Sequence, residues 1–73
     1  MANEDIKAVL DELLHNGKIF FILPGNVAYL IRSKPKFGFE LSWWSPSGIS
    51  EPETLSIDEV LNFIRKNLKY HIL

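Results

Sequence analysis

The chain opens with apolar positions spaced for one face of a helix. The stripe consists of Ile6, Val9, Leu10, Leu13 and Leu14, at intervals of three and four. Asn3 suits the N-cap, and Glu4 and Asp5 suit the first turn, where the helix dipole favours negative charge. Gly17 predicts the end of this helix, because glycine readily adopts the left-handed conformation of a C-terminal cap.

After Gly17 the pattern changes to short runs of β-branched and aromatic residues, which are typical of strands. We predict strands over residues 18–23, 27–33 and 36–44. Gly25-Asn26 is a recognised two-residue hairpin signal, and Lys34-Pro35 predicts the second turn.

The C-terminal third reads as a loop followed by a second helix. Residues 45–54 contain two prolines and a glycine and predict the loop. Ser56 and Glu59 fit an S-x-x-E capping box. The apolar stripe that follows consists of Ile57, Val60, Leu61, Ile64 and Leu68. The tail from Tyr70 to Leu73 either frays or adds a short strand.

The order of elements is therefore α-β-β-β-α, and the predicted class is α+β. We expect one domain over residues 1–73, a three-stranded antiparallel meander with both helices packed on one face. If Leu23 pairs with Ala28 and Ser33 with Lys36, strand alternation assigns the faces. The predicted core face holds Ile19, Phe21, Leu23, Ala28, Leu30, Phe37, Phe39, Leu41 and Trp43.

The opposite face of the sheet is unusually apolar for a surface in water. It collects Phe20, Ile22, Val27, Tyr29, Ile31 and Trp44, interrupted by Lys18, Gly38, Glu40 and Ser42. An antiparallel sheet with one wet face normally alternates between apolar and polar residues. We predict that Phe20, Ile22, Tyr29, Ile31 and Trp44 bind a partner. The alternative is that one helix or the C-terminal tail covers this face.

Composition narrows the class of protein. A chain of 73 residues buries only roughly 60% of its unfolded surface, so domains of this size often need a disulfide, a metal or a partner subunit. There is no cysteine, and two histidines do not make a structural zinc site, so no metal or cofactor is expected. With no apolar run long enough for a membrane and no secretory signal, the expected location is the cytoplasm.

Arg32, Lys34 and Lys36 form a small basic cluster around the second turn. This cluster suits an acidic partner or a few phosphates, although charges at a turn also simply solubilise it. Lys36-Phe37-Gly38-Phe39 resembles the aromatic RNA-binding strand of an RNA-recognition motif over these few residues. The sequence departs from that motif at Glu40, where an aliphatic residue is the rule, and the order of elements differs. The net charge of −1 also argues against a strongly basic nucleic-acid binder.

Ser45, Ser47 and Ser50 have no accompanying His and Asp pattern, so an enzyme is not expected, and no small-molecule substrate is evident. The favoured function is a small protein-interaction module: an inhibitor, an adaptor or a phage-type accessory protein. It would bind through the outer sheet face and the loop between Trp44 and Glu53, either to a foreign protein or to a second copy as a homodimer. The alternative is a weak nucleic-acid-binding domain that uses the basic cluster with Tyr29 or Trp44.

Overall fold

A computed structural model describes the backbone of residues 2–72 and the side chains of residues 4–72. Its elements confirm the predicted α+β class. In chain order they are α1 (Ala2–Asn16), β1 (Lys18–Leu23), β2 (Val27–Lys34), β3 (Gly38–Ser45), β4 (Gly48–Ile49), β5 (Glu53–Leu55), α2 (Ile57–Asn67), the 3₁₀ turn η1 (Leu68–Tyr70) and β6 (His71–Ile72).

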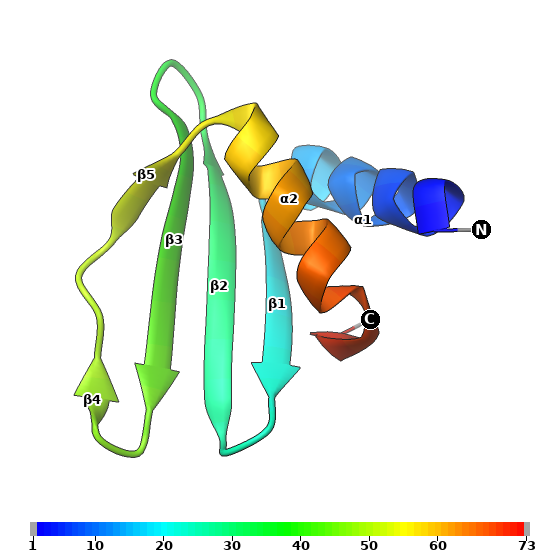
Figure 1. Cartoon of the computed structure of the whole chain (residues 1–73). Coiled ribbons are helices and arrows are strands. Elements are labelled where there is room, and N and C mark those ends of the chain that lie inside the picture. Colours follow the sequence, from blue (N-terminus) through cyan, green and yellow to red (C-terminus); the bar gives the residue numbers. More distant parts are fainter. Residues whose placement is uncertain (1, 73) are drawn as a thin grey trace.

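The predicted meander of β1, β2 and β3 forms the centre of a wider sheet. The strand order is β4-β3-β2-β1-β6, and β5 also pairs with β3, further along the edge that β4 occupies (Figure 1). The two short strands β4 and β5 lie where the sequence predicted only a loop. The C-terminal tail adds a strand, since His71 and Ile72 pair with β1. Leu73 lies outside the described residues.

Both hairpins have three-residue turns instead of the two-residue turns that were predicted. Leu23 pairs with Val27 across the first turn, where Gly25 and Asn26 have φ angles of 86° and 61°. Lys34 pairs with Gly38 across the second turn. Two successive left-handed residues close the first hairpin, which glycine and asparagine tolerate better than other residues do.

This change of register exchanges the two faces of β2, so that the side chains predicted to point outward point toward the helices. Relative to the predicted pairing, β2 is shifted by one residue against β1 and by three against β3. Each odd shift exchanges the faces of a strand, so the two shifts together leave β1 and β3 as predicted and reverse β2 alone. Tyr29 and Ile31 therefore lie on the helix-covered face, whereas Ala28 and Leu30 lie on the outer face. Phe37, predicted in the core, is 78% exposed in the second turn.

The core lies between the sheet and the two helices, which cover the same face. It is built from Ile6, Val9, Leu13, Ile19, Phe21, Ile31, Leu41, Leu55, Val60 and Ile64. At its centre the ring of Phe21 meets Phe63 edge-on at 5.2 Å, and Tyr29 packs on the same Phe63 at 5.0 Å. At the β4 end the sheet extends past the helices (Figure 1). Trp43 lies there on the inner face, opposite Tyr29, and is 38% exposed.

The ends of the helices follow the predicted signals with one exception. Ser56 and Glu59 form the full capping box, in which the Glu59 N–H donates to Ser56 Oγ at 3.2 Å and the Ser56 N–H to Glu59 Oε1 at 3.0 Å. Gly17 ends α1 with a φ of 84°, and its N–H donates to the carbonyl oxygen of Leu13. α1 begins at Ala2, so Asn3 lies inside the helix instead of at its N-cap. The carbonyl oxygen of Asp11 lies 2.8 Å from His15 Nδ1.

Ile31 provides the test of this register. Ile31→Ala should lower the free energy of unfolding by about 2–5 kcal/mol, and Ile31→Val by about 0.5–1.5 kcal/mol, because the side chain is fully buried between sheet and helices. Ile49→Ala, on the exposed edge strand, should change it by less than about 0.5 kcal/mol. Urea denaturation followed by circular dichroism measures all three. An Ile31→Ala protein as stable as the Ile49→Ala protein would contradict the register.

Candidate functional site

The outer face of the sheet is ordered into three cross-strand rows. The first apolar row is Ile72, Phe20, Leu30 and Ser42, from β6 across to β3. The second apolar row is Ile22, Ala28, Trp44 and Ile49, from β1 across to β4. The charged row is Lys18, Arg32, Glu40 and Thr54, from β1 across to β5. Neighbours within a row face each other in register, so each row forms a continuous strip.

The two apolar rows leave a substantial hydrophobic surface in contact with solvent. Phe20, Ile22, Ile49 and Ile72 are between 38% and 73% exposed. Leu30 lies on the central strand between Phe20 and Ser42 and is only 6% exposed. Together the exposed members present on the order of 400 Å², which is the size of the largest apolar patch on a typical monomer, and such patches are often functional.

No element among residues 2–72 crosses this face. Both helices contribute their buried side chains to the opposite side of the sheet, and α2 is seen in front of the strands in Figure 1, with the outer face turned away from the viewer. β6 joins the sheet at the edge of β1 and does not lie across it. The alternative in which a helix or the tail buries the outer face is therefore wrong for the described part of the chain.

Of the residues predicted from the sequence to bind a partner, some lie on the outer face of the sheet and others on the helix-covered face. Phe20, Ile22 and Trp44 lie together in the two apolar rows, and Arg32 lies in the charged row beside them. Lys34 ends β2 on the same face, and Lys36 is exposed in the second turn. Tyr29 and Ile31 lie on the other face. Ile31 is fully buried and Tyr29 packs on Phe63, so neither belongs to the outer surface.

Four apolar members of the rows were not among the residues named from the sequence for partner binding: Ala28, Leu30, Ile49 and Ile72, of which Ile49 lies in the predicted binding loop between Trp44 and Glu53. Leu30 was placed in the core by the two-residue turn. Pro24-Gly25-Asn26 fits a three-residue hairpin containing glycine equally well, and only that choice of turn places Leu30 on the outer face. Ile49 and Ile72 belong to two-residue strands, β4 and β6, which are too short to show alternation.

The segment between Trp44 and Glu53 is held at the edge of the sheet by strand pairing and hydrogen bonds. Trp44 pairs with Ile49 and Ser45 with Gly48, so β3 and β4 form a tight hairpin. Ser50 fixes its far end, because its Oγ accepts from the N–H of Trp43 at 2.9 Å and its own N–H donates to the Trp43 carbonyl at 2.9 Å. The segment thus extends the second apolar row by one strand.

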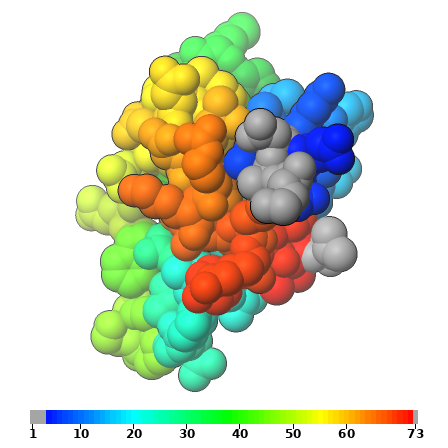
Figure 2. Space-filling model, turned by 45° about the vertical axis from the view of Figure 1, so that its right-hand side comes forward, coloured from blue at the N-terminus to red at the C-terminus, as the bar shows by residue number. Residues whose placement is uncertain are grey.

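A groove on another side of the molecule is the second candidate. Its volume is about 650 Å³, and it lies between α1 and the segment formed by α2 and η1. Figure 2 shows this side, where the C-terminal segment (red) lies next to α1 (blue) and α2 (orange). The groove is lined by Asp5, Ala8, Val9, Glu12, Arg65, Lys66, Leu68, Lys69 and His71.

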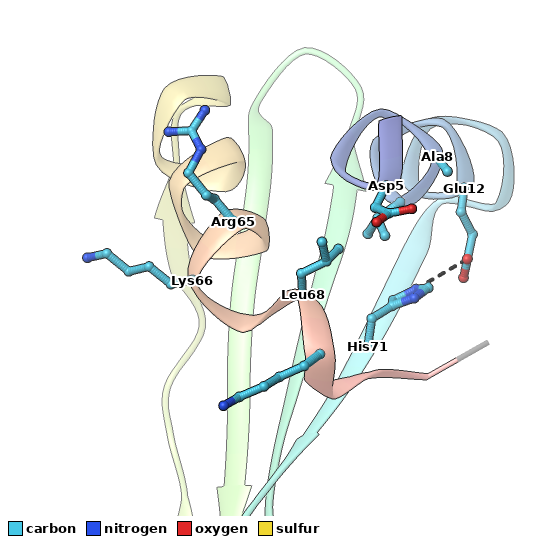
Figure 3. Close-up of a pocket in the computed structure, with 9 residues that line it drawn as sticks. Asp5, Ala8, Glu12, Arg65, Lys66, Leu68 and His71 are labelled. Atoms are coloured by element: carbon cyan, nitrogen blue, oxygen red, sulfur yellow. Dashed lines mark ion pairs between the residues drawn. The ribbon is translucent and has the colours of Figure 1, made fainter. Parts of the chain in front are cut away.

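The polar side chains of this groove do not converge on a common point. Glu12 and His71 face each other, with 3.2 Å between Glu12 Oε1 and His71 Nε2, whereas Arg65 and Lys66 point away from this pair (Figure 3). His71 Nε2 is enclosed and makes no hydrogen bond of good geometry, and its contact with Glu12 is an ion pair only when the imidazole is protonated. Within residues 4–72, no three His, Asp or Glu side chains are close enough to hold a metal ion. The pair joins the C-terminal strand to α1.

Comparison of the chain with protein-family models, with curated proteins and with solved structures gave no match. Over residues 2–72, no helix has the length and apolar character needed to cross a membrane.

Glu12 should hold the C-terminal strand in place. Glu12→Ala removes the carboxylate next to a His71 side chain that is 6% exposed, so the amides of β6 should exchange severalfold faster, equivalent to about 1 kcal/mol. Asp11→Ala, at an exposed position of the same helix, should leave these amides unchanged. Hydrogen exchange followed by NMR measures both. Equal exchange rates in the two variants would show that the pair does not anchor β6.

Proposed function

We propose that this chain is a small protein-interaction module that binds a protein surface through the outer face of its sheet. One observation carries the proposal: two adjacent apolar rows run across the sheet on the side that neither helix covers. Water exposure of these side chains is unfavourable by roughly 25 cal/mol for each Å² of apolar surface, so a partner that covers them gains free energy. An inhibitor, an adaptor or an accessory protein of the cytoplasm acts in this way without catalytic groups or a cofactor.

The composition of the face supports a protein partner. Trp44 is of a residue type enriched in the energetic centres of interfaces, and it lies among aliphatic side chains in the second apolar row. The charged row lies along one side, with Lys18 opposite Arg32 and Arg32 opposite Glu40. An apolar centre with a polar rim is the usual anatomy of a specific protein interface.

A second candidate function is weak nucleic-acid binding at the other end of β2. Arg32, Lys34 and Lys36 gather there, and the exposed Phe37 could stack on a base. Tyr29 does not support it, because it lies on the opposite face. Glu40 is paired with Arg32 in the sheet and reduces the positive potential. Protein binding is the better-supported function.

Ile22 and Ile57 form a matched pair of test positions. They are 48% and 43% exposed, but Ile22 is in the second apolar row and Ile57 opens α2. Ile22→Glu should leave the protein folded and abolish its binding to protein, whereas Ile57→Glu should preserve both properties. Tagged proteins incubated in an extract of the source cells, followed by quantitative mass spectrometry of the bound proteins, compare the variants.

The same experiment separates the two functions through salt. Protein partners held by the apolar rows should remain bound at about 1 M salt, because apolar contacts are not screened. Binding to phosphates by three cations should fall steeply, with log K decreasing by roughly 0.7–0.9 of a unit per contact for each tenfold rise in salt. Identical sets of bound proteins for the wild type and both variants would overturn the proposed function.

A further inference from the structure

We propose that the surface bound by the outer face is the outer face of a second copy of the chain, in a symmetric dimer. This inference rests on the proposed function and names the partner. It is drawn from the arrangement of large and small side chains in the two apolar rows, which makes the face complementary to itself.

Large and small residues alternate between the rows on β2 and β3, two of the three strands that have a neighbour on each side; on β1 both positions, Phe20 and Ile22, are large. On β2, Leu30 in the first apolar row is followed along the strand by Ala28 in the second. On β3 the order is reversed, with Ser42 in the first row and Trp44 in the second. A large side chain in one row thus lies next to a small one in the other row of the same strand, although Leu30 is only 6% exposed and contributes little of its own surface.

Consider a two-fold axis that lies in the plane of the interface, perpendicular to the strands and midway between the two apolar rows. Such an axis brings large side chains of one copy opposite small side chains of the other. It lays the first apolar row of each copy on the second apolar row of the other and keeps each strand above its own counterpart. Leu30 then faces Ala28 of the second copy, Trp44 faces Ser42, and Phe20 faces Ile22. The side chains of the two sheets can interdigitate at the spacing of about 10 Å that packed sheets adopt.

The charged row selects this axis over the other simple arrangement. An axis parallel to the strands would lay the charged row on itself and bury Lys18, Arg32 and Glu40 in the interface, where the loss of their hydration is costly even when opposite charges meet. The axis across the strands places the two charged rows at opposite margins of the interface, where Lys18, Arg32 and Glu40 stay hydrated.

The area available places the dimer among the small interfaces, which are weak or transient. Two faces of on the order of 400 Å² each, with the polar margins, bury a total of about 1,000 Å², which is the lower limit of specific interfaces. Larger interfaces of about 1,600 Å² bind with micromolar or better affinity, so a dissociation constant on the order of 100 µM is expected. A small core without disulfides gains from such an association.

Sedimentation equilibrium between about 1 µM and 1 mM protein tests self-association. The wild type and Ile57→Glu should pass from monomer to dimer, and Ile22→Glu should remain monomeric. In the wild type, NMR shifts that depend on concentration should map to the apolar rows, with no substituted protein involved. A wild type that stays monomeric at 1 mM overturns the dimer and leaves the proposed function standing. A dimer that persists in Ile22→Glu overturns the outer face as the dimer interface, whereas the proposed function is decided by the comparison of bound proteins.

Complementary charges test the register of the two copies. Phe20→Glu and Ile22→Lys should each be monomeric alone. Mixed, they should form a heterodimer at least tenfold more tightly than either variant associates with itself, because Glu at position 20 then faces Lys at position 22. In the control mixture, Phe20→Glu with Ile49→Lys, the charges lie on strands at opposite sides of the sheet, and no such gain is expected. Equal behaviour of the two mixtures overturns the proposed axis.

Discussion

The pairing of β2 with its two neighbours is the constraint on which the rest of the structure depends. Side chains of a strand alternate between faces, so one residue of register decides whether all of them point into the core or out of it. Here three-residue turns set the register, with left-handed residues at Gly25 and Asn26 in the first turn. Because β2 is the central strand, its assignment decides the membership of both faces: Ile31 completes the core, and Leu30 becomes the centre of the outer surface.

This dependence explains which parts of the sequence prediction were right. The two helices, the capping box of Ser56 and the three long strands follow from local patterns, and the structure confirms them. The faces of β1 and β3 were also right, since the two errors of register were both odd and cancelled between these strands. β2 was reversed, because Gly25-Asn26 satisfies a two-residue turn as well as the three-residue turn that includes Pro24. Local sequence does not distinguish these turns; the packing of Ile31 under the helices does.

The candidate site was predicted in kind and only partly in its residues. An excess of apolar residues over what one core requires is visible in the sequence, because the count does not depend on register. The identity of the residues in this excess does depend on the strand register. Tyr29 and Ile31 were therefore wrongly placed on the outer face. Ile72 joins the surface because it pairs with Phe20, which is far from it in the chain. Ile49 joins it because it pairs with Trp44 through β4, a strand of only two residues. Such contacts follow from tertiary packing.

Strand propensity alone would explain single apolar residues on the outer face, since phenylalanine, isoleucine and tryptophan all favour strands. It does not explain their distribution. Threonine has a similar propensity and suits a wet surface, yet the outer face has only Thr54, and that residue lies in the charged row. Apolar residues occupy the two rows nearest the β1–β2 turn except at Ser42, and charges appear only beyond them, in the third row and at Lys34. Propensity acts on each position separately and does not account for a separation into rows across several strands, and on this separation the proposal that a protein covers the face rests.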